Sequence, residues 1–165
     1  MMQPILNELR QEAVTTRRIL ERVPSEQLSW GPHAKSMTLG QLSMHIATIP
    51  GNIVGWAQKD EFDIATANFA RSEPQSNEQI LAAFDDSLKT AENYLENLDE
   101  PSARAKWRLT ANGKELFALP RAGLLRTIML NHWYHHRGQL SVYLRLLDVP
   151  VPTIYGPSAD ENPFA

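Results

Sequence analysis

Hydrophobic residues recur at helical spacing in four stretches of this chain. Two of the stretches open on a capping box, in which paired side chains satisfy the free backbone N–H groups at the start of a helix. These pairs are Thr38 with Gln41 and Ser76 with Gln79. The pattern predicts helices over residues 4–22, 38–56, 76–98 and 121–147.

Polar and turn-forming residues mark the connections between these stretches. Pro50–Gly51 lies inside the second helix, and we expect a kink there and not an end, because the apolar spacing continues beyond it. Asn112–Gly113 is a strong hairpin signal, so we expect a small hairpin or extended excursion, and not a sheet, over residues 106–119. Irregular structure is expected over residues 25–37, 60–75 and the Pro-rich tail 148–165.

Together these elements predict an all-α fold, an up-down antiparallel four-helix bundle with a minor hairpin or extended excursion before the last helix. The length of 165 residues fits a single domain spanning residues 1–165, and no repeat or linker divides it. A chain of this length can bury a core without a structural metal. A bound metal would therefore serve function and not folding.

The composition excludes several classes of protein. Hydrophobic residues make up 42% of the chain and charged residues 21%, as in soluble globular proteins. The absence of cysteine excludes disulfides, thiolate metal ligands and a cysteine nucleophile, and it suits a reducing cytoplasm. A net charge of −3 without a Lys/Arg cluster argues against nucleic acid as a partner. We expect no membrane partner either, because no apolar run approaches the roughly 20 residues that span a bilayer.

Three of the five histidines lie in residues 131–139 of the last predicted helix. His132 and His136 are four residues apart, so they project from one helix face and can share a metal ion. His45 lies on the inward face of the second helix, so packing the two helices together would close a three-histidine site. Three imidazoles suit zinc, nickel, copper or ferrous iron and leave coordination open for water or substrate. His135 is rotated about 100° from His136 and is expected outside the ligand set.

The alternative is that these are core histidines, hydrogen-bonded to neighbours such as Asn131, Gln139 or Tyr134. Spacing alone leaves both interpretations open. In a metal site, Asn131 and Gln139 would orient the ligands through hydrogen bonds. His33 lies in a Gly-Pro loop and is expected at the surface.

Four further features are candidates for chemistry. Asp160 and Glu161 would serve as bases only if the tail folds over the bundle, and we prefer tail anchoring or solvated charge for both. Arg137 is a candidate for binding an anionic substrate, although a helix arginine more often extends along the surface. Gly138 within a helix suggests close approach of another helix or chain. We expect the four tryptophans to make core or dimer contacts and prefer this to a role in lining the mouth of a pocket; they are Trp30, Trp56, Trp107 and Trp133.

Two segments resemble signatures of the DinB-like superfamily of metal-dependent enzymes. Met37–Ala47 resembles its second helix, and Asn131–Leu140 its last helix. Val149–Glu161 is similar to the ending of many members, so the likeness extends from the first helix to the tail. The resemblance implies an up-down four-helix bundle, often a homodimer, with a divalent metal held by His45, His132 and His136.

The reactions of similar proteins imply what such a site would do. Some members transfer thiols with bacillithiol, mycothiol or glutathione, and one branch isomerises maleylpyruvate with mycothiol. The resemblance thus implies a divalent metal (zinc, nickel or iron) and a low-molecular-weight thiol, acting on a small electrophilic substrate. The alternatives are a hydrolase that activates water at the metal, and a non-catalytic metal-binding or stress-response module. Catalytic residues beyond the ligands are not identified.

Overall fold

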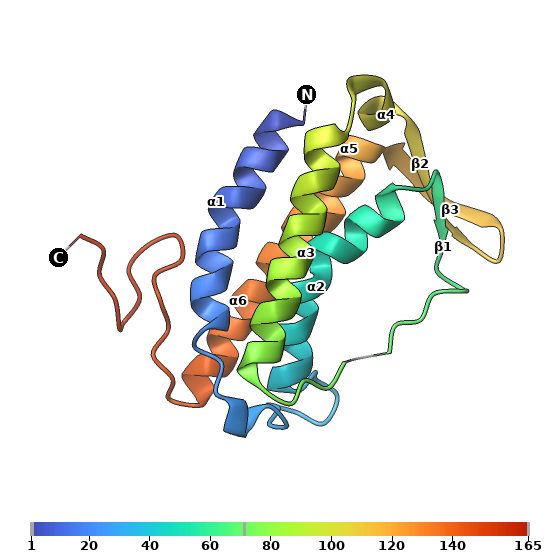
Figure 1. The fold of residues 1–165 in the computed structure, drawn as a ribbon. Coiled ribbons are helices and arrows are strands. Elements are labelled where there is room, and N and C mark those ends of the chain that lie inside the picture. Colours follow the sequence, from blue (N-terminus) through green and yellow to red (C-terminus); the bar gives the residue numbers. More distant parts are fainter. Residues whose placement is uncertain (1, 71, 165) are drawn as a thin grey trace.

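The computed structural model describes residues 2–70 and 72–164, which are mostly helical with one small three-stranded sheet (Figure 1). The helices are α1 (Gln3–Leu20), α2 (Leu39–Ala57), α3 (Asn77–Asn97), α4 (Glu100–Arg104), α5 (Arg121–Leu124) and α6 (Asn131–Leu146). A π-helical segment, Leu125–Leu130, joins the last two, and a short 3-10 turn covers Ser25–Gln27. The strands are β1 (Glu61–Asp63), β2 (Lys106–Ala111) and β3 (Lys114–Pro120).

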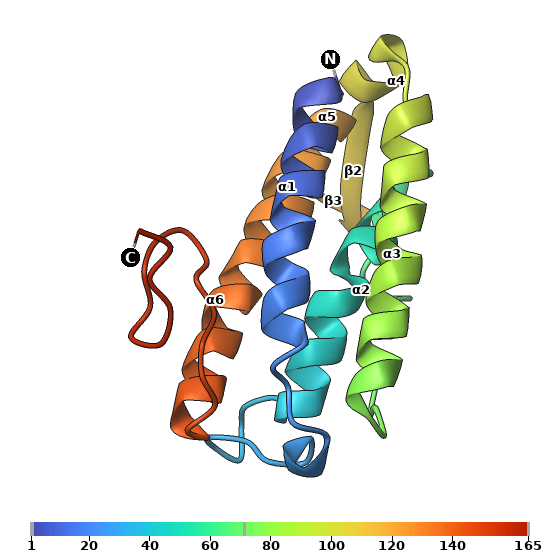
Figure 2. The same cartoon turned by 60° about the vertical axis from the view of Figure 1, so that its left-hand side comes forward.

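Four long helices, α1, α2, α3 and α6, lie side by side and enclose the core (Figures 1 and 2). Most of the apolar positions predicted from the spacing are buried, but Val14 of α1 and Val142 and Leu146 of α6 are exposed. The largest fully buried side chains include Trp107, Trp133, Phe84, Leu9, Ile19 and Leu42. Within residues 2–70 and 72–164, no helix combines the length and apolar character that a membrane crossing requires.

The predicted helix starts at Thr38 and Ser76 are confirmed. Thr38 Oγ1 accepts from the Gln41 N–H at 3.1 Å, and Gln41 Oε1 accepts from the Thr38 N–H at 3.0 Å, which completes the capping box. Ser76 Oγ accepts from the Gln79 N–H at 3.4 Å, whereas Gln79 Oε1 accepts from the Gln75 N–H. Both helices therefore begin where local side-chain chemistry satisfies their free N–H groups.

Neighbouring helices α2 and α3 run parallel to each other. The Gly51 N–H donates to Ser87 Oγ at 2.8 Å, and the Tyr94 hydroxyl donates to the Ala57 carbonyl at 2.9 Å. Contacts thus advance along both helices in the same direction. Residues 58–76 connect them and return the chain to the end where α2 began (Figure 1).

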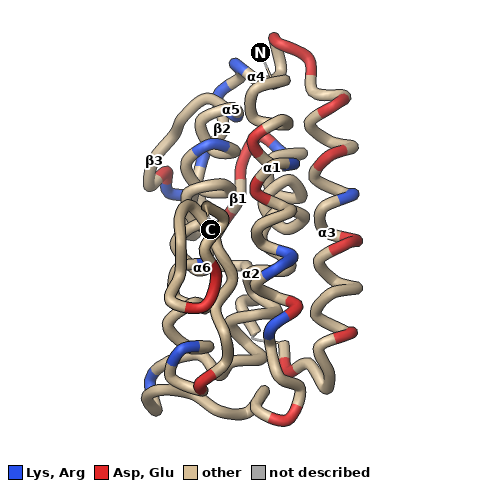
Figure 3. Tube along the Cα trace, turned by 90° about the vertical axis from the view of Figure 1, so that its left-hand side faces the viewer, with Lys and Arg blue, Asp and Glu red and all other residues tan. Residues whose placement is uncertain are grey.

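Charged pairs between α1 and α3 show that these two helices run antiparallel. Arg10 of α1 binds Glu92 at 2.9 Å, and Arg17, further along α1, binds Asp85, which lies earlier in α3. Figure 3 shows the acidic positions of α3 beside basic positions of α1. Each pair is substantially exposed, so each contributes at most about 1 kcal/mol to stability.

The predicted up-down alternation of the helices is wrong. Tyr134 of α6 donates to Glu8 at 2.9 Å, and Arg137 donates to Thr16 Oγ1 at 3.0 Å, so α6 runs parallel to α1. The helices therefore run up, down, down and up. The long 58–76 connection makes this order possible, because a crossover of that length spans the helices and lets two consecutive helices run parallel.

A three-stranded sheet flanks the helices, which corrects the expectation of an all-α fold without a sheet. The predicted hairpin is confirmed: β2 and β3 pair antiparallel around Asn112 (φ 51°) and Gly113 (φ 76°). β1, which lies in the region expected to be irregular, pairs parallel with β2. Asp63 of β1 accepts hydrogen bonds from the Gly113 N–H at 3.0 Å and the Asn112 N–H at 3.1 Å. These bonds attach the crossover to the hairpin turn and lower the pKa of Asp63.

Candidate metal centre

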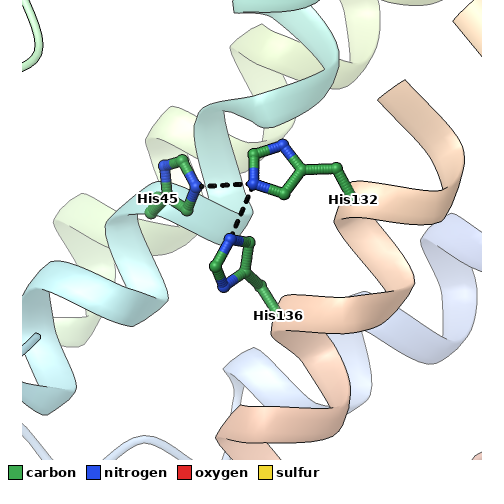
Figure 4. A group of neighbouring side chains, drawn as sticks. All are labelled: His45, His132 and His136. Atoms are coloured by element: carbon green, nitrogen blue, oxygen red, sulfur yellow. Dashed lines mark hydrogen bonds between the residues drawn. The ribbon is translucent and has the colours of Figure 1, made fainter. Parts of the chain in front are cut away.

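Three histidine side chains from two helices meet at one point (Figure 4). His45 projects from α2, and His132 and His136 project from α6, one turn apart. Nε2 of His132 lies 3.4 Å from Nε2 of His45 and 2.7 Å from Nε2 of His136. All three side chains are half-buried, so the cluster lies between the helix interface and solvent.

The predicted last helix, residues 121–147, contains the π-helical segment Leu125–Leu130 directly before the site. In a regular α-helix, residues seven positions apart lie on the same face, so position 126 would be buried like Trp133. Arg126 is instead exposed, and Leu125 is fully buried. The π segment thus shifts the buried face by one residue, so that the apolar stripe before it and the stripe after it both face the core.

A proline inside α2 is compensated by side chains from α6 and α3. Pro50 has no N–H, so the carbonyl of Ile46 lacks the donor that a helix normally supplies four residues later. The indole N–H of Trp133 donates to this carbonyl at 2.9 Å. On the other side, the Gly51 N–H donates to Ser87 Oγ. Because Ile46 follows His45 and Trp133 follows His132, the indole bond sets the register of α2 against α6 at the histidine cluster.

Hydrogen bonding and burial prepare the imidazoles to act as ligands. Nδ1 of His136 lies 2.7 Å from Gln139 Oε1. An amide oxygen only accepts, so the proton sits on Nδ1 and the lone pair of Nε2 faces the cluster. Burial, reinforced by the neighbouring His136 and His135, lowers the pKa of His132 to about 4. Burial also lowers the pKa of His136. Both rings are therefore neutral at pH 7, as metal ligation requires.

The three Nε2 atoms fit the geometry of a transition-metal ion. Ligand nitrogens about 2.0–2.1 Å from a tetrahedral zinc ion lie about 3.3 Å apart. The His45–His132 separation of 3.4 Å matches this value, and the His132–His136 separation of 2.7 Å would have to widen by about 0.6 Å. One ligand atom from each residue lies within 4.8 Å of the other two. The cluster could therefore hold one ion.

A cavity of about 640 Å³ opens beside the cluster, and His45 and His132 form part of its wall. One side is a partly buried face of α2, and the other is the crossover, which contributes Phe62 of β1, residues 67–70 and Ser72. A cavity of this size accommodates a small-molecule ligand. Among the described residues that line it, none is Asp, Glu, Lys or Arg.

The remaining histidines lie outside the cluster. His135 is exposed, and only its ring edge contacts His136, with centroids 4.9 Å apart. His33 is exposed in its loop, where Nδ1 accepts from the Lys35 N–H. Asn131 accepts from Arg126 instead of orienting a ligand, so of the two predicted orienting groups only Gln139 contacts a cluster histidine.

Arg137 is neither a surface residue nor a group that lines the cavity. Its side chain is 1% exposed and forms a 2.6 Å ion pair with Glu12 of α1. It also donates to Thr16 Oγ1 and to the hydroxyl of Tyr155. Arg137 therefore joins α6 to α1 and to the tail, which corrects the expectation of an arginine extended along the surface.

The two tail carboxylates anchor the tail, as preferred from the sequence. Asp160 binds Arg145 and accepts from the Val151 N–H at 2.8 Å. Glu161 bridges two arginines of the α1 end, Arg18 at 2.5 Å and Arg22 at 2.9 Å. These hydrogen bonds and ion pairs lower the pKa of both carboxyls. Figure 1 shows the tail on the opposite side of the helices from the crossover that lines the cavity.

The four tryptophans divide between the core and the cavity. Trp107 and Trp133 are core residues, 1% and 0% exposed. Trp30 packs edge-on against Tyr143, whereas Trp56 lines the cavity. Gly138, expected at a close approach, has no described atom from beyond its chain neighbours and its own helix backbone within 4 Å of where its Cβ would lie.

The cavity wall contains residues that the sequence analysis missed. Gln41, Thr48 and Asn52 line it from the same face of α2 as His45. Their spacing from His45, four residues before and three and seven residues after, places them on one helix stripe. Polar residues that recur on one stripe of an otherwise apolar helix indicate the wall of a cavity, and this pattern could have identified the three residues from the sequence.

Comparison with known proteins agrees with the fold. The sequence model of the DinB family matches residues 1–163. The chain belongs to the DinB family. It is also similar to the Bacillus subtilis protein YrdA, described as uncharacterized, with 27% identity over 158 residues, which cover 91% of this chain and 85% of YrdA.

Solved structures share the fold of this DinB-family chain. A DinB-like protein from Bacillus cereus superposes with a TM-score of 0.71 at 23% identity, covering 92% of this chain and 95% of that one. The DinB-like protein YjoA from Bacillus subtilis has a TM-score of 0.71 at 20% identity, covering 92% and 97%. At these identities the likeness concerns the fold alone.

Proposed function

We propose that His45, His132 and His136 hold a divalent metal ion, and that the chain is a metal-dependent enzyme acting on a small molecule in the adjacent cavity. The observation that carries this proposal is the convergence of three imidazoles at one point, with two of them, His45 and His132, in the cavity wall. Three protein ligands are typical of catalytic metal sites, because they leave coordination open to water or substrate. Zinc, nickel and iron all accept this ligand set.

The reaction class that we propose is transfer of a low-molecular-weight thiol to an electrophilic substrate. A divalent ion at this site would lower the pKa of a bound thiol and supply it as the thiolate nucleophile. Hydrolysis would instead call for a general base near the attacking water. No carboxylate lines the cavity among the described residues, and Asp160 and Glu161 are held by arginines elsewhere. This lining favours thiol transfer over hydrolysis.

The chain's own residues would position the reactants. Gln139 fixes the proton of His136 on Nδ1, so that Nε2 is available to the ion. The bond from Trp133 to Ile46 holds the two ligand-bearing helices in register. Apolar residues of α2 and the crossover line much of the cavity, where they would exclude water from a reactive thiolate.

Metal content of the purified protein tests the site. We expect about one zinc, nickel or iron ion per chain by mass spectrometry, and its loss in His132→Ala. The matched control is His135→Ala, which removes a histidine of the same helix that lies outside the cluster and should retain the ion. Stoichiometric metal in His132→Ala would overturn the assignment.

The reaction class needs a separate measurement. In cobalt-substituted protein, binding of cysteine, glutathione or 2-mercaptoethanol should produce a thiolate-to-cobalt absorption band that saturates. Metal-dependent consumption of the thiol by 1-chloro-2,4-dinitrobenzene would then support transfer. A cobalt spectrum unchanged by all three thiols would remove thiol transfer and leave the metal site intact.

Three further proposals follow from the composition and the family. We propose that residues 1–165 fold as a single domain, that the chain works in a reducing cytoplasm, and that it forms a homodimer. The homodimer stays a prediction of the family resemblance. Light scattering of the purified protein measures it directly.

A further inference from the structure

One hydroxyl of the cavity wall lies beside the histidine cluster. Thr48 lines the cavity from α2, three residues after His45, and is half-buried. Residues three apart on a helix are neighbours on its surface, with Cβ atoms about 5–6 Å apart. Thr48 Oγ1 also lies 3.4 Å from the His45 carbonyl oxygen. The hydroxyl therefore lies against the helix turn that carries this histidine.

The proton of this hydroxyl is already in use. Thr48 Oγ1 donates to the Met44 carbonyl at 2.9 Å. A carbonyl oxygen carries no proton, so the hydroxyl is the donor in this bond and in the longer contact with His45. Its oxygen keeps two lone pairs, and none of the described residues donates a hydrogen bond to it. Thr48 therefore offers a ligand an acceptor and, unless its helix bond breaks, no donor.

The other polar side chains on this stripe of α2 are less suited to engage a ligand at the histidines. Both ends of the Gln41 amide are bonded, its oxygen within the capping box and its nitrogen to Glu73. Asn52 is exposed and lies seven residues from His45, which is about two helix turns. On this stripe, Thr48 is thus the polar side chain nearest to His45 that a ligand could engage.

We propose that Thr48 is a specificity-determining residue, which selects ligands that carry an N–H or O–H group next to the atom that binds the metal ion. This group donates to Thr48 Oγ1. A ligand with an acceptor at the same place must draw the hydroxyl proton away from the Met44 carbonyl and so loses one hydrogen bond of the protein. The selected class includes thiols with an adjacent hydroxyl or amide. The inference rests on the proposed metal site.

A matched pair of hydroxamates tests the selection. Acetohydroxamate and N-methylacetohydroxamate bind a metal ion through the same two oxygen atoms, but the first has an N–H beside them and the second has a methyl group there. Each is titrated into cobalt-substituted protein, and the visible spectrum of the cobalt reports the dissociation constant. The ratio of the two constants is compared between variants, so that the intrinsic difference in their affinity for cobalt cancels.

Thr48→Val removes the hydroxyl and keeps the shape of the side chain. The preference for acetohydroxamate should fall by about three- to tenfold in this variant, because only that probe loses a hydrogen bond. Thr48→Ser, which keeps the hydroxyl, should behave like the wild type. The matched control is Thr90→Val. Thr90 of α3 also donates to the carbonyl four residues before it, at 2.8 Å, but it is exposed and does not line the cavity, so the ratio should not change.

Two results would overturn the proposal: a ratio that is unchanged in Thr48→Val, or no binding of either hydroxamate to the cobalt-loaded protein. The first of these leaves the metal site and the thiol reaction intact. If thiols leave the cobalt spectrum unchanged while the hydroxamate ratio depends on Thr48, thiol transfer fails and the selection by Thr48 stands. A protein that takes up no cobalt would refute both. The two failures are therefore distinguishable.

Discussion

Replacing Trp133 with phenylalanine isolates the hydrogen bond that links the two ligand-bearing helices. The indole N–H donates to the Ile46 carbonyl at 2.9 Å, and Pro50 leaves that carbonyl without its regular helical donor. The substitution keeps an aromatic ring next to Phe84 but leaves a buried carbonyl unpaired. An unpaired buried acceptor costs about 1–3 kcal/mol, and the lost ring volume adds about 1 kcal/mol or more. We therefore expect a loss of about 2–4 kcal/mol in the free energy of unfolding.

Urea unfolding followed by far-ultraviolet circular dichroism measures this loss without relying on tryptophan fluorescence. Trp107→Phe is the matched control, because Trp107 is equally buried and donates to the Trp56 carbonyl at 3.2 Å. That carbonyl also accepts from the Lys59 N–H, so it keeps a partner when the indole is removed. Trp107→Phe should cost at least about 1 kcal/mol less than Trp133→Phe.

Restoring the missing backbone donor gives the decisive test. Pro50→Ala supplies an N–H four residues after Ile46, so the carbonyl is satisfied within the helix. Trp133→Phe should then cost about 1–2 kcal/mol less in the Pro50→Ala background than in the wild type. Equal costs in the two backgrounds, within about 0.5 kcal/mol, would refute the compensation.

Three further predictions concern pH, packing and the buried ion pair. In metal-free protein, the pKa of His132 is about 4 in the folded chain, against 6.5 for an ordinary histidine, so the unfolded chain binds more protons between these two pH values. The urea concentration at the unfolding midpoint should therefore fall as the pH drops from 6.5 to 4. The fall should be smaller in His132→Asn. Gly51→Ala should lower the melting temperature, because its Cβ would lie 3.1 Å from the α3 backbone. Gly55→Ala should raise it, because no described atom from beyond its chain neighbours and its own helix backbone lies within 4 Å of the added Cβ. Arg137→Met should cost about 3–5 kcal/mol in urea unfolding by leaving Glu12 unpaired, and Glu12→Met in the same chain should restore part of the loss; no recovery would contradict the pairing.

Part of the candidate site was predictable because its geometry is local. His132 and His136 share a face in any α-helix, and the capping box at Thr38 fixes where the helix of His45 begins. The cavity was not predictable in this way. Phe69 reaches Trp56 only because the crossover folds back across α2 and joins the hairpin through Asp63.

The burial of Arg137 also could not be predicted from the local sequence pattern. Arg137 lies on the core side of α6, where the sequence gives a charged residue among apolar ones. Whether such a residue extends to solvent or is buried depends on partners that are distant in sequence. Here Glu12 and Tyr155, from the two ends of the chain, supply them.

By itself the sequence determined the long helices, the caps of α2 and α3, the hairpin turn and the pair of histidines on one helix face. These features follow from the backbone period and from side chains a few residues apart. Only the tertiary structure decided the helix directions, the third strand, the approach of His45 to within 3.4 Å of His132, and the cavity beside them. These depend on contacts between distant segments, which are set by how the 58–76 crossover and the core pack together.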